Sequence, residues 1–194
     1  MRFRDTGLDG AWLIEPERRT DERGYFARTW CIDEFDLHGI GVSFVQCSTS
    51  YNKSCSTLRG LHLQLAPYLE AKLIRCTRGR AWDVMVDLRP DSPTFGQWRA
   101  FELSAGNGRL VYLPEGFAHG FQTVEDDTEL AYHISEFYQP TASAGIRWDD
   151  PELAIDWPDR DAPVMSQHDR GLPSFAEFRE RHLDGGAAAL RRAS

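Results

Sequence analysis

The feature that most constrains the fold is a succession of short segments rich in β-branched and aromatic residues. Glycine, proline, asparagine and aspartate separate them, and these residues favour turns. No long amphipathic segment lies between the strand-like ones, which disfavours a helix-linked parallel sheet. We therefore predict an all-β fold, a jelly-roll barrel of eight or more strands with a ligand in the barrel mouth. The predicted strands are residues 42–47, 58–64, 71–77, 81–88, 97–103, 109–113, 120–124 and 129–134.

The N-terminal region is predicted to add a further pair of strands and a short helix. Residues 11–16 and 25–30 are expected to pair around the turn-rich sequence at residues 21–24. A short helix over residues 32–37 is expected to end at Gly39.

The C-terminal region is predicted to be helical again. Ser174 and Glu177 have the spacing of a capping box before residues 178–183, and Gly185 and Gly186 are expected to end this helix. The chain shows no internal repeat and no linker. We predict a single domain over residues 1–194, with a core to about residue 170 and a C-terminal helix and mobile tail over residues 171–194.

Composition and charge exclude several classes of function. Hydrophobic residues make up 41% of the chain and charged residues 27%, as in globular proteins. The net charge is −8 without a basic stripe, so nucleic-acid binding is not expected, although local arginines and lysines still allow an anionic ligand. No apolar run is long enough to span a bilayer, and the N-terminus lacks the apolar core of a signal peptide. We expect a soluble cytoplasmic protein without a membrane partner.

The four cysteines are isolated from one another and form no C-x-x-C pair. We expect them to be free, buried, small hydrophobic side chains rather than disulfides or metal ligands. They are Cys31, Cys47, Cys55 and Cys76.

Ionisable side chains fall on two of the predicted strands. In residues 58–64, alternation places Gly60, His62 and Gln64 on one face and two leucines on the other. In residues 71–77, Lys72 shares a face with Ile74 and Cys76. A histidine and a lysine on the inner faces of a barrel are costly unless they bind a ligand or serve chemistry.

One interpretation of these residues is a metal site. His62 and His119 could be ligands, with Glu70 as a carboxylate, and the P-x-G-x-x-H sequence ending at His119 is similar to the second metal motif of cupins. The first cupin motif supplies H-x-H, whereas here Gln64 takes the place of the second histidine. This ligand set matches a zinc or transition-metal site poorly, so we predict no metal. A metal-dependent cupin isomerase or oxygenase remains the alternative.

The other interpretation is proton transfer at carbon. A histidine such as His62 can remove a proton from a carbon next to a carbonyl group, and Lys72 can stabilise the enolate that forms. A tyrosine suits the return of a proton to the opposite face because it stays protonated at neutral pH. Tyr132 and Tyr138 are the candidates. A carboxylate usually orients such a histidine, but these considerations do not select one from the 30 acidic residues.

A series of ordered motifs resembles the dTDP-4-dehydrorhamnose 3,5-epimerase family of cupin-fold enzymes. The similarity extends from about the first predicted strand to Asp169, which is most of the chain. The motifs are residues 21–24 (DERG), 58–64 (LRGLHLQ), 72–76 (KLIRC), 83–89 (DVMVDLR), 92–96 (SPTFG), 113–121 (LPEGFAHGF), 145–151 (GIRWDDP) and 155–158 (IDWP).

The resemblance implies a function and a set of roles. It implies a homodimeric jelly roll, free of metal and cofactor, that inverts carbon 3, carbon 5 or both of a dTDP-linked or related nucleoside-diphosphate 4-keto-6-deoxyhexose in deoxysugar biosynthesis. It assigns the base to His62, enolate stabilisation to Lys72 and the acid to Tyr132. It pairs His62 with Asp169, the aspartate of a late S-x-x-D segment. The substrate-binding residues that it implies are Arg23, Phe26, Gln46, Arg59, His119 and Tyr138.

Several positions depart from the family pattern. Arg28 stands where the family has a glutamate, residues 47–50 (CSTS) replace a D-N pair, and His133 replaces a lysine. Ser143 or Ala144 replaces a further glutamate, and the basic residue before Asp169 is a histidine. The catalytic core matches while these contact positions differ, so the nucleotide, the sugar and the inverted carbons stay open. A sugar-nucleotide-binding protein without catalysis is a further alternative.

Overall fold

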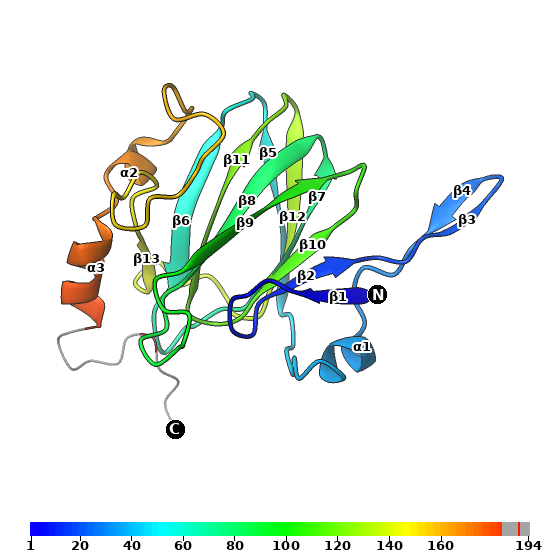
Figure 1. Ribbon diagram of the computed structural model, residues 1–194, viewed down its shortest axis with the longest axis horizontal. Helices are drawn as coiled ribbons and strands as arrows, with labels where there is room; N and C mark the ends of the chain where they lie inside the picture. Colours follow the sequence, from blue (N-terminus) through cyan, green and yellow to red (C-terminus); the bar gives the residue numbers. More distant parts are fainter. Residues whose placement is uncertain (184–189, 191–194) are drawn as a thin grey trace.

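The computed structural model describes residues 1–183 and residue 190, and it has the predicted mostly-β architecture (Figure 1). Two antiparallel sheets face each other, with strand orders β1-β2-β10-β7-β12-β5 and β13-β6-β11-β8-β9. A two-stranded hairpin, β3-β4, stands apart from both. The elements are β1 (Arg2–Asp5), β2 (Trp12–Glu15), β3 (Arg19–Asp21), β4 (Gly24–Phe26), α1 (Ile32–Asp36), β5 (Gln46–Asn52), β6 (Leu58–Gln64), β7 (Lys72–Arg78), β8 (Arg80–Asp87), β9 (Trp98–Ser104), β10 (Leu110–Leu113), β11 (Phe117–Thr123), β12 (Thr128–Ile134), β13 (Ser143–Gly145), α2 (Gln167–Arg170) and α3 (Phe175–His182).

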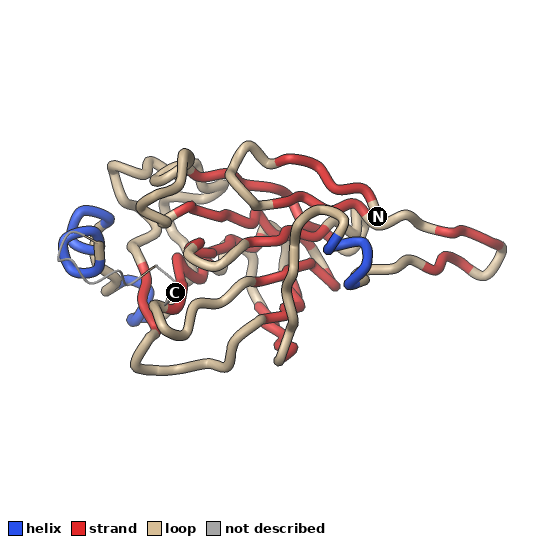
Figure 2. The backbone as a smooth tube through the Cα atoms, turned by 90° about the horizontal axis from the view of Figure 1, so that it is seen from below, coloured by secondary structure: helices blue, strands red, loops and turns tan. Residues whose placement is uncertain are grey.

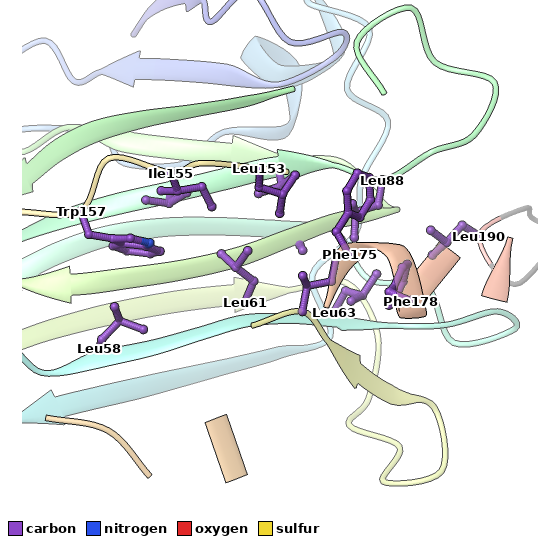
Figure 3. Packing of buried hydrophobic residues seen from close by; sticks show 14 of the residues in the cluster. Leu58, Leu61, Leu63, Leu88, Leu153, Ile155, Trp157, Phe175, Phe178 and Leu190 are labelled. Atoms are coloured by element: carbon purple, nitrogen blue, oxygen red, sulfur yellow. The ribbon is translucent and has the colours of Figure 1, made fainter. Parts of the chain in front are cut away.

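Three apolar layers hold the two sheets and their covering segments together. One fills the space between the sheets and includes Ile74, Cys76 and Phe121. A second joins the outer face of the six-stranded sheet to α1 through Phe35. The third lies on the outer face of the five-stranded sheet, where the C-terminal segment packs over β6 (Figure 3). Each central strand is therefore buried on both faces.

Seven of the eight predicted barrel strands are confirmed. β6 is reproduced residue for residue, β7, β8, β9, β10 and β12 agree within one residue, and β11 begins three residues before the predicted limit. The prediction for residues 42–47 is wrong in its limits, because β5 covers Gln46–Asn52 instead. Val42 and Phe44 pack beside the α1 layer without forming a strand. The polar residues that do form β5 carry no apolar alternation, so propensity gave no signal for them.

The predicted pairing of residues 11–16 with residues 25–30 is also wrong. β2 pairs with β1 and β10, because Leu13 and Ile14 are buried in layers on opposite faces and need a central place in the sheet. Residues 19–26 form their own hairpin, in which every residue is exposed. Both views show this hairpin extending away from the two sheets (Figures 1 and 2).

Both predicted helices form. α1 is followed by Gly39, and Ser174 is the N-cap of α3, with both halves of the predicted capping box in place. Residues 185 and 186, the predicted end of α3, and most of the predicted tail lie outside the described residues. The division of the single domain at about residue 170 stays a prediction. Among the described helices, none has the length and apolar character needed to cross a membrane.

The four cysteines are free, as predicted, but they are not all buried. Cys76 lies in the layer between the sheets, whereas Cys47 and Cys55 are exposed. Cys47 belongs to β5, which is the edge strand of its sheet, and Cys55 lies in the turn that follows. Cys31 is half-buried, so the prediction of burial is confirmed for Cys76 and wrong for the other three.

Candidate active site

A cavity of about 470 Å³ opens between the two sheets. Its walls come from β5, β7 and β12 of one sheet and from β6 and β11 of the other. Most of the residues proposed from sequence meet here. They are Gln46, Arg59, His62, Lys72, His119, Tyr132 and Tyr138.

A bulge in β6 places two of these residues on the same wall. Gly60 has φ of +123°, and the pairing of β6 with β11 shifts register beside it. A Cβ at Gly60 would lie 2.5 Å from the Cα of Gly120, so only glycine allows the two strands to approach this closely. The extra residue brings Arg59 to the cavity face together with His62, whereas strict alternation would separate them.

His62 is paired with a carboxylate from a distant part of the chain. Its Nε2 lies 2.7 Å from Oδ1 of Asp169, which is buried in α2. The Ser166 hydroxyl caps α2 and accepts a hydrogen bond from the Asp169 backbone. Burial acts to raise the pKa of Asp169, but the hydrogen bond and electrostatic attraction of His62, with a backbone hydrogen bond from Gly60, together outweigh it and hold this pKa below the usual carboxyl range. The ionised carboxylate fixes the imidazole and leaves Nδ1 as the nitrogen that can accept a proton.

Lys72 is held beside His62 by a buried ion pair. Its Nζ lies 2.8 Å from Oε1 of Glu70 and donates a 3.4 Å hydrogen bond to the backbone carbonyl of His62. Glu70 balances the ammonium charge in this poorly solvated position. A positive charge fixed in a partly dry cavity is well suited to stabilise a developing oxyanion.

Tyr132 lies on β12, in the sheet opposite His62. Burial raises its pKa well above the usual tyrosine value, and the negative charge of Asp83 adds to this effect. The hydroxyl therefore keeps its proton at neutral pH and can act as an acid. The ring of His119 makes an edge contact with Tyr132, with 5.9 Å between ring centroids.

His119 is itself paired with Asp83. Its Nε2 lies 2.9 Å from Oδ2 of Asp83, and both side chains are buried. Across residues 1–183 and 190, the other oxygen of this carboxylate has no hydrogen-bond partner. Sequence reasoning did not include Asp83, although an aspartate within the apolar stretch at residues 83–86 was a visible signal.

The remaining cavity residues are polar groups around its edge. Arg59 donates from Nε to Oδ1 of Asn52, and no hydrogen bond from its other two nitrogens is found within residues 1–183 and 190, so these nitrogens can bind an anion. Gln46 donates to the carbonyl of Glu136, and Tyr138 is exposed at the rim. Several positions that depart from the family pattern also line the cavity, namely Ser48, Thr49, Ser50, Ser143 and His168.

Two of the predicted binding residues lie outside this cavity. Arg23 and Phe26 belong to the projecting β3-β4 hairpin, where Arg23 is ion-paired with Asp21 and Phe26 is 73% exposed. Their role in substrate binding stays a prediction.

The alternative metal ligands do not form a cluster. His62, Glu70 and His119 each have a different partner, as described above. In the described part of the chain, one group of three His, Cys, Asp or Glu side chains is close enough to share an ion, and it consists of His62, His168 and Asp169.

The two-sheet barrel, with ionisable side chains on facing walls of its cavity, has the fold and the kind of site found in acid–base isomerases of the cupin-type jelly-roll class. Comparison with family models identifies the family, because residues 5–177 match the model for dTDP-4-dehydrorhamnose 3,5-epimerase. The chain belongs to this family. The family, fold, isomerase class and deoxysugar-epimerase function predicted from sequence are thereby confirmed.

Individual relatives agree with this result. The chain is 46% identical to a dTDP-4-dehydrorhamnose 3,5-epimerase of Methanothermobacter thermautotrophicus, over 91% of this chain and 96% of the relative. It is 39% identical to a dTDP-4-dehydrorhamnose 3-epimerase of Streptomyces niveus, over 94% and 88% respectively. The structure also superposes on the crystal structure of a dTDP-6-deoxy-D-glucose-3,5-epimerase from Legionella pneumophila in complex with dTDP-4-keto-L-rhamnose. The TM-score is 0.87 and the sequence identity is 35%, over 100% of this chain and 98% of that chain.

Proposed function

We propose that this protein inverts carbons 3 and 5 of a dTDP-linked 4-keto-6-deoxyhexose, with His62 as the base and Tyr132 as the acid. The observation that supports these roles is their position on opposite walls of one cavity, His62 on β6 and Tyr132 on β12. A sugar ring held between the two sheets would meet a base on one face and a proton donor on the other. Inversion requires this arrangement.

The proposed reaction proceeds through an enolate. Nδ1 of His62, oriented by Asp169, takes the proton from a carbon next to the keto group, and the electron pair moves to the keto oxygen. The ammonium of Lys72 stabilises the resulting negative charge. Tyr132 then donates its proton to the opposite face of the same carbon, and solvent restores both residues. Carbons 3 and 5 flank the keto group, so the same groups serve both.

Family membership and the polar edge of the cavity support the proposed substrate. The guanidinium of Arg59 is suited to bind a diphosphate, and the Legionella relative binds dTDP-4-keto-L-rhamnose. The relatives include both 3,5-epimerases and a 3-epimerase. Which carbons exchange is therefore part of the test.

We also propose that the protein acts as a homodimer in the cytoplasm. Tyr25 and Phe26 expose 56% and 73% of their surface, and among the described residues neither belongs to any of the three apolar layers. In a dimer, this hairpin could carry Arg23 and Phe26 to the cavity of the partner. Four free cysteines fit a reducing compartment.

The mechanism is tested by NMR in deuterated water with a panel of 4-keto-6-deoxy sugar nucleotides. The wild type is expected to incorporate deuterium at carbons 3 and 5, and His62→Ala is expected to lose both exchange and inversion. In Tyr132→Phe, exchange should persist while inversion is lost. His38→Gln, at an exposed histidine outside the cavity, is the matched control. Near-normal turnover by His62→Ala would contradict its role as the base, and unchanged inversion by Tyr132→Phe would exclude it as the acid.

The exchange of hairpins is tested by mixing two variants. Arg23→Ala and His62→Ala should each be inactive as separate dimers. If the hairpin serves the partner's cavity, a mixed dimer contains one cavity with neither defect, and mixing after dissociation restores activity. If mixed dimers form but activity is not restored, Arg23 acts in the cavity of its own chain.

A further inference from the structure

The cluster of His62, His168 and Asp169 has the donors of a transition-metal site. His62 projects from β6, while His168 and Asp169 are consecutive residues of α2. One ligand atom from each residue lies within 4.8 Å of the other two. Two imidazoles and one carboxylate provide three protein ligands, which leaves one position of a tetrahedral ion open to water or substrate.

The surroundings of His168 favour its use as a ligand. Its ring lines the cavity and lies 6.2 Å from the ring of His62, at an interplanar angle of 33°. No hydrogen bond to this ring is found within residues 1–183 and 190, so neither nitrogen is committed to another partner. A protonated lysine or arginine at this position would have no lone pair to offer.

The other two ligands are already fixed in place. Asp169 is 5% exposed, its backbone is tied to the Ser166 cap, and it faces His62 at 2.7 Å. Metal ligands held by outer hydrogen bonds of this kind lose less conformational freedom when an ion binds. Zinc bonds of about 2.0–2.1 Å to nitrogen and oxygen place two ligand atoms of a tetrahedral site about 3.3 Å apart. The distance between Nε2 of His62 and Oδ1 of Asp169, now 2.7 Å, would therefore increase by roughly 0.6 Å when zinc binds.

We propose that these three side chains bind Zn²⁺ reversibly and that the bound ion inhibits the enzyme. The ion takes the place of the proton between His62 and Asp169, and the neutral imidazole keeps that proton by moving it to Nδ1. The inhibitory part rests on the proposed function, because it assumes that His62 is the base. An imidazole bound to zinc through Nε2 and protonated on Nδ1, with its carboxylate drawn into the same coordination sphere, has no lone pair left to accept a proton from carbon.

Binding is measured with Zn²⁺ alone, independently of any substrate. Isothermal titration calorimetry of the chelator-treated full chain uses a Cys47→Ser/Cys55→Ser background, since these two exposed thiols would also bind zinc. One equivalent of Zn²⁺ is expected per chain. His168→Gln in this background should weaken the binding at least about tenfold, as expected for the loss of one of three ligands. His38→Gln, at an exposed histidine outside the cluster, should leave the affinity unchanged.

Inhibition is measured on the same proteins relative to the zinc-free rate of each. The zinc concentration that halves turnover should match the calorimetric affinity, rise at least about tenfold in His168→Gln and be reversed by chelator. Equal zinc affinity in the background protein and His168→Gln would overturn the proposed site, and so would the absence of stoichiometric binding in an active enzyme. Zinc binding that depends on His168 in a protein that epimerises no substrate would instead overturn the proposed function and leave the metal site standing.

Discussion

Replacing Asp169 with asparagine tests how much the buried carboxylate contributes to His62. The substitution keeps nearly the same volume in a position that is 5% exposed, but it removes the negative charge that faces Nε2 at 2.7 Å. The amide can also present its own N–H to Nε2. In that case His62 keeps its proton on Nδ1, and the nitrogen that faces the substrate can no longer accept one.

The expected magnitude follows from the lost hydrogen bond. Hydrogen bonds to charged groups contribute about 1.5–3 kcal/mol, and each ~1.36 kcal/mol corresponds to a tenfold change in rate. His62 gains a positive charge in the transition state, which strengthens its hydrogen bond to Asp169. Loss of this bond should therefore lower kcat by roughly 10- to 160-fold. Asp169 does not line the cavity, so KM should change much less.

The assay compares kcat and KM of Asp169→Asn with those of the wild type on the dTDP-4-keto-6-deoxy sugar, after thermal unfolding has shown that both proteins are folded. Asp161→Asn, at an exposed aspartate in the same C-terminal segment, is expected to keep kcat within about twofold. A folded Asp169→Asn variant with wild-type kcat would refute the proposed orienting role. A rise in KM alone would mean that Asp169 acts on binding rather than on proton transfer.

Three further predictions concern stability and reactivity. Gly60→Ala should lower the free energy of unfolding by about 2–6 kcal/mol in urea denaturation, because the new Cβ would clash with the backbone of β11 and the residue would be strained at its positive φ. Gly41→Ala is the control, because the position of its Cβ is open space. Burial acts to raise the pKa of Asp87, but hydrogen bonds from a guanidinium and two hydroxyls hold it below its usual value. The ionised form of Asp87 therefore stabilises the fold at any pH above the unfolded-state pKa of about 3.9. The decrease in the free energy of unfolding caused by Asp87→Asn should be constant near neutral pH and become smaller as the pH falls below that value. A decrease that does not depend on pH would contradict this prediction. Burial raises the pKa of the Cys76 thiol to about 11, so iodoacetamide at pH 8 should modify exposed Cys55 first and Cys76 only after unfolding, as mass spectrometry of the peptides would show.

Sequence patterns were sufficient where a residue's surroundings depend on local periodicity. Alternation in residues 58–64 predicted β6 and most of the division of its faces. His62 and Gln64 line the cavity, Leu61 packs in the outer layer, and Leu63 packs there while also bordering the cavity. Alternation likewise placed Lys72 on the inner face of β7. These predictions succeed because a strand buried on both faces has no freedom to slip by one residue.

Local patterns failed where a contact between distant segments decides the conformation. The bulge at Gly60 depends on the close approach of β11, so alternation alone could not place Arg59 beside His62. β5 forms because it pairs with β12, although its polar residues lack a strand signal. The partnership of His62 and Asp169 spans 107 positions, and only resemblance to a family of known roles suggested it.

The two faces of β6 connect catalysis with the stability of the C-terminal segment. The leucine face packs in the outer layer against Phe175 and Phe178, which follow α2 directly in the chain (Figure 3). That packing holds α2 at the edge of the cavity, and α2 brings Asp169 to the histidine on the opposite face of the same strand. His62, the proposed base, is thus oriented by a segment that the outer apolar layer holds in place. Changes that loosen this layer should reduce proton transfer before they unfold the barrel, because the layer between the sheets does not include Leu61, Leu63, Phe175 or Phe178.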